Sequence, residues 1–213
     1  TVADIQLSVN LPHHFKGTHM SRFIEVLNQF RGEMTMRTMP ALLNELRDKL
    51  DAESAHINIR FPYFVEKQAP VSKLTGLMDY TCGFEGEANS SRQDFILEAN
   101  IPSTSLCPCS KEISDYGAHN QRSLITIKVR STMGDDGLPQ IIWIEELISI
   151  AEEASSAPVY PLLKRDDERW VTMQAYDHPA FVEDILRDIA VALKADARVG
   201  WFHVLVENFE SIH

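Results

Sequence analysis

Hydrophobic and polar positions alternate in several short segments of the chain. In residues 4–10, Ile5, Leu7 and Val9 share one side and polar residues fill the other. This two-residue period is typical of a strand with one buried face. Similar runs predict strands at 57–61, 95–99, 124–129 and 202–206, with a further extended segment over 74–84.

Other segments repeat their apolar residues at helical spacing. The pattern predicts one helix over 23–30 and a second beginning near Pro40, with its apolar face extending to Leu50. It predicts another pair over 144–151 and 181–193. Each half of the chain therefore inserts two helices between strands.

This order of elements predicts an α+β fold. Strands with short connections pair in antiparallel fashion, and helices grouped between them cover one face of a sheet. We expect two similar tandem modules, each an antiparallel sheet with a helix pair on one face. The first covers residues 1–90 and the second, with most of the candidate chemistry, covers 91–213.

The charge balance limits the partners. Thirty-one acidic and 20 basic residues give a formal net charge of −11. No excess positive charge is available for phosphates, so we expect no general binding of nucleic acid or of an anionic membrane. No apolar run approaches the roughly 20 residues that span a bilayer. A single anionic small molecule remains compatible with this charge.

The cysteine count favours a reducing compartment. Cys82, Cys107 and Cys109 are three in number, so they cannot all pair within the chain. We therefore predict a cytoplasmic protein. A chain of this length buries a core without a structural metal, so any metal it holds is expected to be functional.

The densest chemistry lies in residues 105–123. A thiolate from Cys107 and the imidazole of His119, twelve residues later, suit zinc if the segment loops back. Alternatively, Cys107 is a nucleophile with His119 as its base and Lys111 lowering the thiol pKa. In a third interpretation, Cys107 is a small buried hydrophobe. The spacing alone leaves all three open.

Two later segments also carry candidate groups. The charge run over 164–169 is typical of a solvated loop, although its carboxylates and cations could also bind a metal and a phosphate. Glu210 and His213 lie close together in the final segment, where exposed residues are common.

Taken together, the motifs resemble those of the type IB GTP cyclohydrolases, metal-dependent enzymes of the tunnelling fold. The matching blocks are GTHMSR (17–22), TSLCPCSKEIS (104–114), YGAHNQRS (116–123), LLKR (162–165) with DE (167–168), FVED (181–184) and ENFESIH (207–213). The resemblance implies two tunnelling-fold modules and a homotetramer with active sites at subunit interfaces. It also implies conversion of GTP and water to 7,8-dihydroneopterin triphosphate and formate, the first step of tetrahydrofolate-type pterin biosynthesis.

By the same resemblance, Cys107, His119 and Glu168 correspond to the family's metal ligands. The implied cofactor is one divalent metal per active site, which a Cys/His/Glu set would take as zinc, manganese or ferrous iron. An ion bound in this way acidifies its water, which then attacks C8 of the guanine. Cys109 and Glu210 correspond, together with His213, to proton-transfer residues.

The resemblance also implies the substrate contacts. Glu183 corresponds to an anchor for the purine ring, because a carboxylate accepts two parallel hydrogen bonds from the guanine edge. Its helical position also suits an exposed side chain. Arg22 and Lys164 are the candidates for the triphosphate, followed by His19 and Lys111.

Two alternatives belong to other classes. One is a tunnelling-fold protein that binds a purine or pterin with a different hydrolytic activity or none. The other is an acidic interaction protein with a thiol redox switch at Cys107 and Cys109. Ligand-type residues at all three metal positions favour the enzyme.

Overall fold

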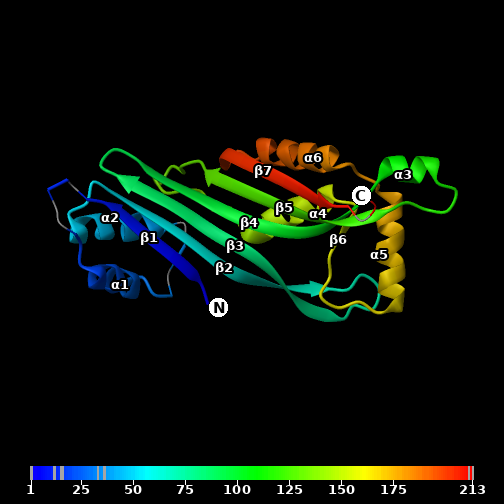
Figure 1. Cartoon of the computed structure of the whole chain (residues 1–213), viewed down its shortest axis with the longest axis horizontal. Coiled ribbons are helices and arrows are strands. Elements are labelled where there is room, and N and C mark those ends of the chain that lie inside the picture. The colour runs from blue at the N-terminus through cyan, green and yellow to red at the C-terminus, as the bar shows by residue number, and fades with distance from the viewer. Residues whose placement is uncertain are drawn as a thin grey trace.

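The computed structural model describes residues 2–11, 13–14, 17–32, 34–35, 37–210 and 212. Within these ranges the chain has an α+β fold with one antiparallel sheet (Figure 1). Its strands are β1 (Asp4–Asn10), β2 (Ser54–Gln68), β3 (Thr75–Asn89), β4 (Gln93–Leu106), β5 (Asn120–Ser131), β6 (Ala157–Pro158) and β7 (Val199–Phe209). Its helices are α1 (Met20–Gln29), α2 (Met39–Leu50), α3 (Pro108–Ile113), α4 (Ile144–Ala154), α5 (Arg165–Asp177) and α6 (Val182–Ala195).

The sheet is continuous across the predicted module boundary. Its strand order is β1-β2-β3-β4-β5-β7, and the short β6 pairs with β4. The boundary at residue 90 falls in the β3–β4 hairpin, where Asn89 Oδ1 accepts hydrogen bonds from the backbone N–H groups of Ser91 and Arg92 at 2.9 and 2.8 Å. The two strands that flank this turn pair with each other. The division into 1–90 and 91–213 stays a prediction.

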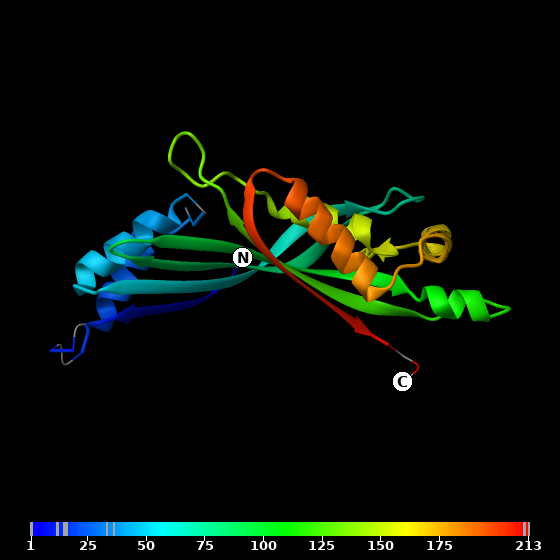
Figure 2. The ribbon, with the colours of Figure 1, turned by 90° about the horizontal axis from the view of Figure 1, so that it is seen from above.

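The four predicted helices are present, and both pairs cover the same face of the sheet. The pair α1 and α2 lies at one end and the pair α4 and α6 at the other (Figure 2). Alternate residues of β3 and β4 face both pairs, since Ala88 and Phe95 pack under α2 while Cys82 and Leu97 pack under α4 and α6. The apolar alternation therefore places two cores on one surface.

Two aromatic residues join these cores. Phe61 of β2 and Phe84 of β3 contact both apolar clusters, and their ring centroids lie 5.6 Å apart. Because buried apolar area is the main source of folding free energy, this contact couples the two ends of the sheet.

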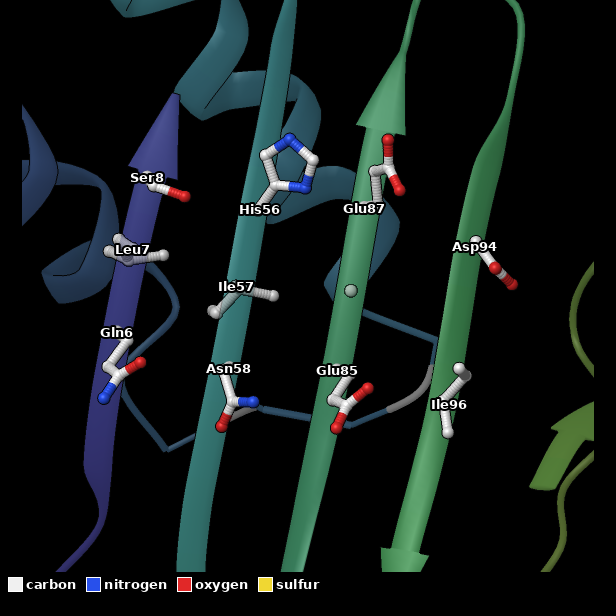
Figure 3. Close-up of a pocket in the computed structure, with 11 residues that line it drawn as sticks. Gln6, Leu7, Ser8, His56, Ile57, Asn58, Glu85, Glu87, Asp94 and Ile96 are labelled. Atoms are coloured by element: carbon white, nitrogen blue, oxygen red, sulfur yellow. The ribbon is translucent and has the colours of Figure 1, made fainter. Parts of the chain in front are cut away.

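The opposite face of the sheet is polar and no helix covers it in the described part of the chain. Figure 3 shows Gln6, His56 and Glu85 projecting away from the helices, while Leu7 and Ile57 point back toward them. A hollow of about 490 Å³ lies on this face.

The structure corrects the interpretation of the charge run over 164–169. This run begins helix α5 instead of forming a loop. Asp167, the third residue of the helix, is fully buried and accepts a hydrogen bond from Lys164 N at 2.9 Å. A carboxylate at this position satisfies a backbone donor that the first helical turn leaves unpaired. The short helix α3 was also not predicted.

None of the helices among the described residues is long and apolar enough to cross a membrane.

Candidate functional site

The inward face of the sheet turns polar at one end. Along β4, the buried sequence Leu97, Ala99 and Ile101 continues into Ser103 and Ser105, which are fully buried. On β5 the partners of these two serines are Ser123 and Gln121. The same strand face therefore supplies the core under α4 and then a set of buried hydrogen-bonding groups.

Cys107 and His119 continue this ladder by one position. The last regular pair is Leu106 with Asn120, and beyond it Cys107 N donates to His119 O at 3.1 Å. The intervening residues form α3 and a return loop. The twelve-residue spacing therefore brings the two together, as the metal interpretation required.

Local hydrogen bonds orient both side chains. Cys107 immediately precedes α3, and its Sγ accepts a hydrogen bond from Ser110 N at 3.4 Å. Ser110 Oγ accepts from His119 N at 3.2 Å, so one serine ties the two segments together. On the His119 ring, Nδ1 lies 3.0 Å from Gln121 Oε1. Both candidate ligands are half-buried.

A cleft of about 600 Å³ opens beside Cys107. Glu183, in the first turn of α6, and Glu210, just after β7, line the same cleft. Its inner wall includes Gln121 and Asn208. The structure thus gathers a thiol, two carboxylates and two amides, of Gln121 and Asn208, from four separate chain segments. Size and composition suit a polar small molecule.

Other predicted residues lie outside this cleft lining. Lys164 and Glu168 are exposed at the start of α5. The other end of that helix approaches α3, where Lys111 Nζ donates to Tyr176 O and lies 4.2 Å from the Tyr176 ring centroid. Eight residues at 1.5 Å per residue put Glu168 roughly 12 Å along the helix from Tyr176.

The donor set fits a divalent ion only in part. The backbones of Cys107 and His119 are hydrogen-bonded to each other, so this end of the sheet carries one sulfur and one imidazole, donors that zinc accepts. Within the ranges that the structure describes, however, no group of three His, Cys, Asp or Glu residues is placed to hold a metal. Glu168 therefore does not complete the set inside one chain.

Helix α1, which contains Arg22 and directly follows His19, lies at the other end of the molecule (Figure 1). Both residues are exposed on or beside α1, and Arg22 Nη1 donates to Lys49 O at the end of α2 at 2.8 Å. The helix pair covers the start of β4, whereas Cys107 follows its end. Fourteen strand residues span roughly 40 Å, so Arg22 cannot reach Cys107 within one chain.

The structure places only one of the three predicted proton-transfer residues, Glu210, in the cleft lining. Cys109 is exposed on α3 and is not part of the cleft lining. His213 lies outside the described residues, although Glu210 precedes it by three positions.

Sequence reasoning missed the amides and hydroxyls that support the site. Ser105, Gln121 and Asn208 form a hydrogen-bonded cluster behind His119. Their signal was present in the strand pattern, because polar residues occupy positions that the alternation assigns to the buried face. Buried polar residues need partners, and Ser105, Gln121 and Asn208 have them, whereas no partner of Ser103 Oγ is found among the described residues.

The start of α5 is held by an ionised carboxylate. Burial alone would raise the pKa of Asp167, but hydrogen bonds lower it well below its usual range. Their donors are Ser72 Oγ at 2.6 Å and the backbone N–H groups of Ser72, Lys164 and Val71 at 2.8 to 2.9 Å. The β2–β3 hairpin is thereby fixed to the helix that carries Lys164 and Glu168.

Comparisons with known proteins point in one direction. All 213 residues match the family described as type I GTP cyclohydrolase folE2. The chain is 57% identical to GTP cyclohydrolase FolE2 of Syntrophotalea carbinolica, over 100% of this chain and 77% of that protein. It is 54% identical to GTP cyclohydrolase FolE2 of Geobacter sulfurreducens, over 100% of this chain and 80% of that protein.

Solved structures show similarity of fold alone. A uricase from Arthrobacter globiformis superposes with a TM-score of 0.51 at 7% identity, over 92% of this chain and 70% of that one.

Proposed function

The chain belongs to the type I GTP cyclohydrolase folE2 family, and from this premise we propose that it converts GTP and water to 7,8-dihydroneopterin triphosphate and formate. This would be the first step in making tetrahydrofolate-type pterins. The observation that carries the proposal is the cleft at the end of β4. It brings Cys107, Glu183 and Glu210 together, with His119 beside them.

We propose that Cys107, His119 and Glu168 hold one divalent ion per active site, which is zinc, manganese or ferrous iron. The thiol and imidazole donors support this assignment. A bound ion of this kind supplies an acidified water that is nucleophilic at neutral pH. Within one chain Glu168 is not placed with the other two donors. We therefore propose that Glu168 reaches the ion only when copies of the chain assemble.

The carboxylates of the cleft have separate tasks in this proposal. Glu183 accepts the N1–H and the 2-amino hydrogens of guanine, a pair of donors that adenine lacks. Ring opening, loss of formate and reclosure each move protons, and Glu210, Cys109 and His213 carry them. The position of Glu210 supports its assignment, because it lines the cleft together with Glu183.

The triphosphate contacts require more than one chain. Arg22 and Lys164, followed by His19 and Lys111, are the proposed donors to the phosphate oxygens. In the described part of the chain, β1 pairs only with β2 and β7 only with β5, so both edges of the sheet can pair with other copies. We propose a cytoplasmic homotetramer whose interfaces bring α1 of one copy to the cleft of another.

A direct assay tests the reaction. The protein, loaded with zinc, manganese or ferrous iron, is incubated with GTP, and released formate is measured together with fluorescent pterin after oxidation. We expect both products in equal amounts. GTP binding without either product would favour the alternative of a purine-binding protein without this activity.

Two cysteine variants form a matched pair for the same assay. Cys107→Ala is expected to lose the bound ion and lower turnover more than about 100-fold, since a direct ligand matters at least as much as its supporting contacts. Cys82→Ala is expected to keep both. Cys82 is fully buried in the core under α4 and α6 and does not line the cleft, and burial raises the pKa of its thiol to about 12.

A further inference from the structure

A network of hydrogen bonds leads from Ala180, two residues before α6, to the ring of His119. Ser105 Oγ, which is inaccessible to solvent, lies 2.9 Å from Ala180 O, 3.3 Å from Gln121 Nε2 and 3.2 Å from Asn208 Nδ2. Gln121 in turn presents Oε1 to His119 Nδ1 at 3.0 Å. Gln121 is only 7% exposed, and together with Ser105 and Asn208 it lines the cleft.

One unambiguous acceptor, the backbone oxygen of Ala180, decides which groups of this network donate and which accept. A backbone carbonyl only accepts hydrogen bonds, so the single hydroxyl hydrogen of Ser105 is committed to Ala180 O. Toward Gln121, Ser105 can then only accept. The Gln121 group that faces it must be the NH₂, and the group that faces His119 must be the carbonyl oxygen.

The same logic holds for Asn208. Its NH₂ donates to Ser105, which leaves Asn208 Oδ1 to accept from Ser123 Oγ at 2.6 Å. Two amides and two hydroxyls are therefore satisfied by one arrangement. Reversing the Gln121 amide would bring two acceptors together at Ser105, which a buried site tolerates poorly.

From this network we infer that Ser105 and Gln121 fix His119 as the Nδ1–H tautomer, so that its Nε2 lone pair is preset to bind the metal. Gln121 is then a positioning residue, acting on the metal through His119. Neutral imidazole carries one hydrogen, and the hydrogen bond at one nitrogen decides which nitrogen is the ligand. The inference rests on the proposed metal site.

The tautomer can be measured directly without metal or activity. In metal-free, ¹⁵N-labelled protein at about pH 8, above the ordinary histidine pKa of about 6.5, long-range ¹H–¹⁵N correlations distinguish the two ring nitrogens. We expect a protonated Nδ1 and an unprotonated Nε2 for His119. A protonated Nε2 in the unmodified protein would overturn the inference.

Substitutions test the relay. Gln121→Met keeps the size of the side chain but removes the acceptor, and we expect a mixture of tautomers and about 10- to 100-fold weaker zinc binding. Gln121→Glu restores an acceptor for Nδ1–H, so we expect it to keep the Nδ1–H tautomer and to bind zinc more tightly than Gln121→Met. Its second oxygen meets the acceptor Ser105 Oγ, so we also expect a lower melting temperature. Ser105→Ala, which frees the amide to reverse, is expected to give an intermediate loss.

Competition with a zinc chelator measures these affinities, and Cys107→Ala serves as the reference for the metal site itself. If Cys107→Ala leaves zinc affinity unchanged, the proposed metal site is wrong. If Cys107→Ala weakens binding while Gln121→Met changes neither affinity nor tautomer, only the role of Gln121 is wrong. Thermal unfolding separates a local effect from loss of the fold.

Discussion

At one end of the sheet, α1 and α2 cover strand residues that stay apolar up to the hairpin, with Ala88 and Phe95 packed beneath them. At the other end, near the start of α6, the same face of β4 and β5 turns from Ile101 and Ile125 to Ser105 and Gln121. Both ends are two-layered. Only the second exchanges apolar burial for a satisfied polar cluster, and that is where the cleft opens.

The difference shows that a buried polar site lowers the stability that the same positions would contribute with apolar side chains. A buried serine or amide contributes less than a buried leucine, and it must be paired to avoid a penalty. The far end keeps its apolar core and carries two candidates for phosphate binding, His19 and Arg22, on the exposed surface. Precise positioning belongs to the cleft, whereas the far end offers cations on a rigid support.

The largest expected effect tests whether the two ends fold as one unit. Leu43 of α2 and Leu147 of α4 are each fully buried, one in each core. Replacing either with Ala is expected to lower the free energy of unfolding by about 2–5 kcal/mol. Because Phe61 and Phe84 contact both cores, we expect a single unfolding transition in calorimetry for both variants.

Two separate transitions, of which each variant shifts only one, would break this expectation. They would instead support the predicted division at residue 90 as a division into independently folding modules. A surface substitution such as Glu153→Gln on α4 is the control and should leave the transition in place.

The second effect concerns the cleft alone. Glu183→Gln replaces one accepting oxygen with a donor, which loses one of the two guanine contacts and opposes the other. We expect kcat/KM for GTP to fall about 100-fold with the metal content unchanged. The neighbouring Asp184, which pairs with Arg187 at 2.6 Å, provides the control, and Asp184→Asn should alter kcat/KM little.

An equal fall in both variants would mean that charge at the start of α6 matters more than recognition by Glu183. The ratio of kcat/KM for GTP to kcat/KM for ATP is a sharper criterion. Only a loss of guanine recognition would lower this ratio.

Much of the fold could be predicted from the chain because its signal is local. The alternation over residues 4–10 became β1, and the helical spacing near Leu42 became α2. Helix α5 was missed because its apolar content is low and its start depends on Asp167 meeting Val71 and Ser72 from a distant hairpin. No local pattern encodes that contact.

The candidate site divides in the same way. Cys107 and His119 could be paired in advance, since a hairpin-like return brings a twelve-residue spacing together. The role of Gln121 could not be predicted, because it depends on hydrogen bonds among β4, β5 and Ala180, two residues before α6. The separation of Arg22 from Cys107 could not be predicted either, because it depends on how far β4, roughly 40 Å long, extends between the two helix pairs.

The third prediction uses that separation. If one active site takes Arg22 from one copy and Cys107 from another, Arg22→Ala and Cys107→Ala complement each other. After unfolding and refolding as an equal mixture, half of the paired chains are mixed, and one of their two sites is intact. Activity should therefore return to about a quarter of the unmodified level.

A mixture that stays as inactive as its components would place Arg22 and Cys107 in the same chain's site, or Arg22 outside any site. The measurement includes thermal unfolding of Arg22→Ala alone, since its guanidinium also holds Lys49 O.

The smallest effect distinguishes the support of α5 from the chemistry beside it. Asp167→Asn keeps the size of the side chain but replaces an acceptor oxygen with a donor, which opposes the N–H groups of Val71 and Ser72. We expect the melting temperature at neutral pH to fall by several degrees. Asp166→Asn, one residue earlier and exposed, is the control and should melt as the unmodified protein does.

The pH dependence carries the sign of this effect. The pKa of Asp167 is lower in the folded protein than in the unfolded chain, so ionised Asp167 stabilises the fold fully above about pH 4 to 5. That stabilisation is lost as the pH falls toward the folded pKa. The melting-temperature gap between the unmodified protein and Asp167→Asn should therefore narrow as the pH falls below about 4. A gap that stays constant throughout the acid titration would mean that the hydrogen-bond acceptors of the Asp167 side chain, and not its charge, fix the start of α5.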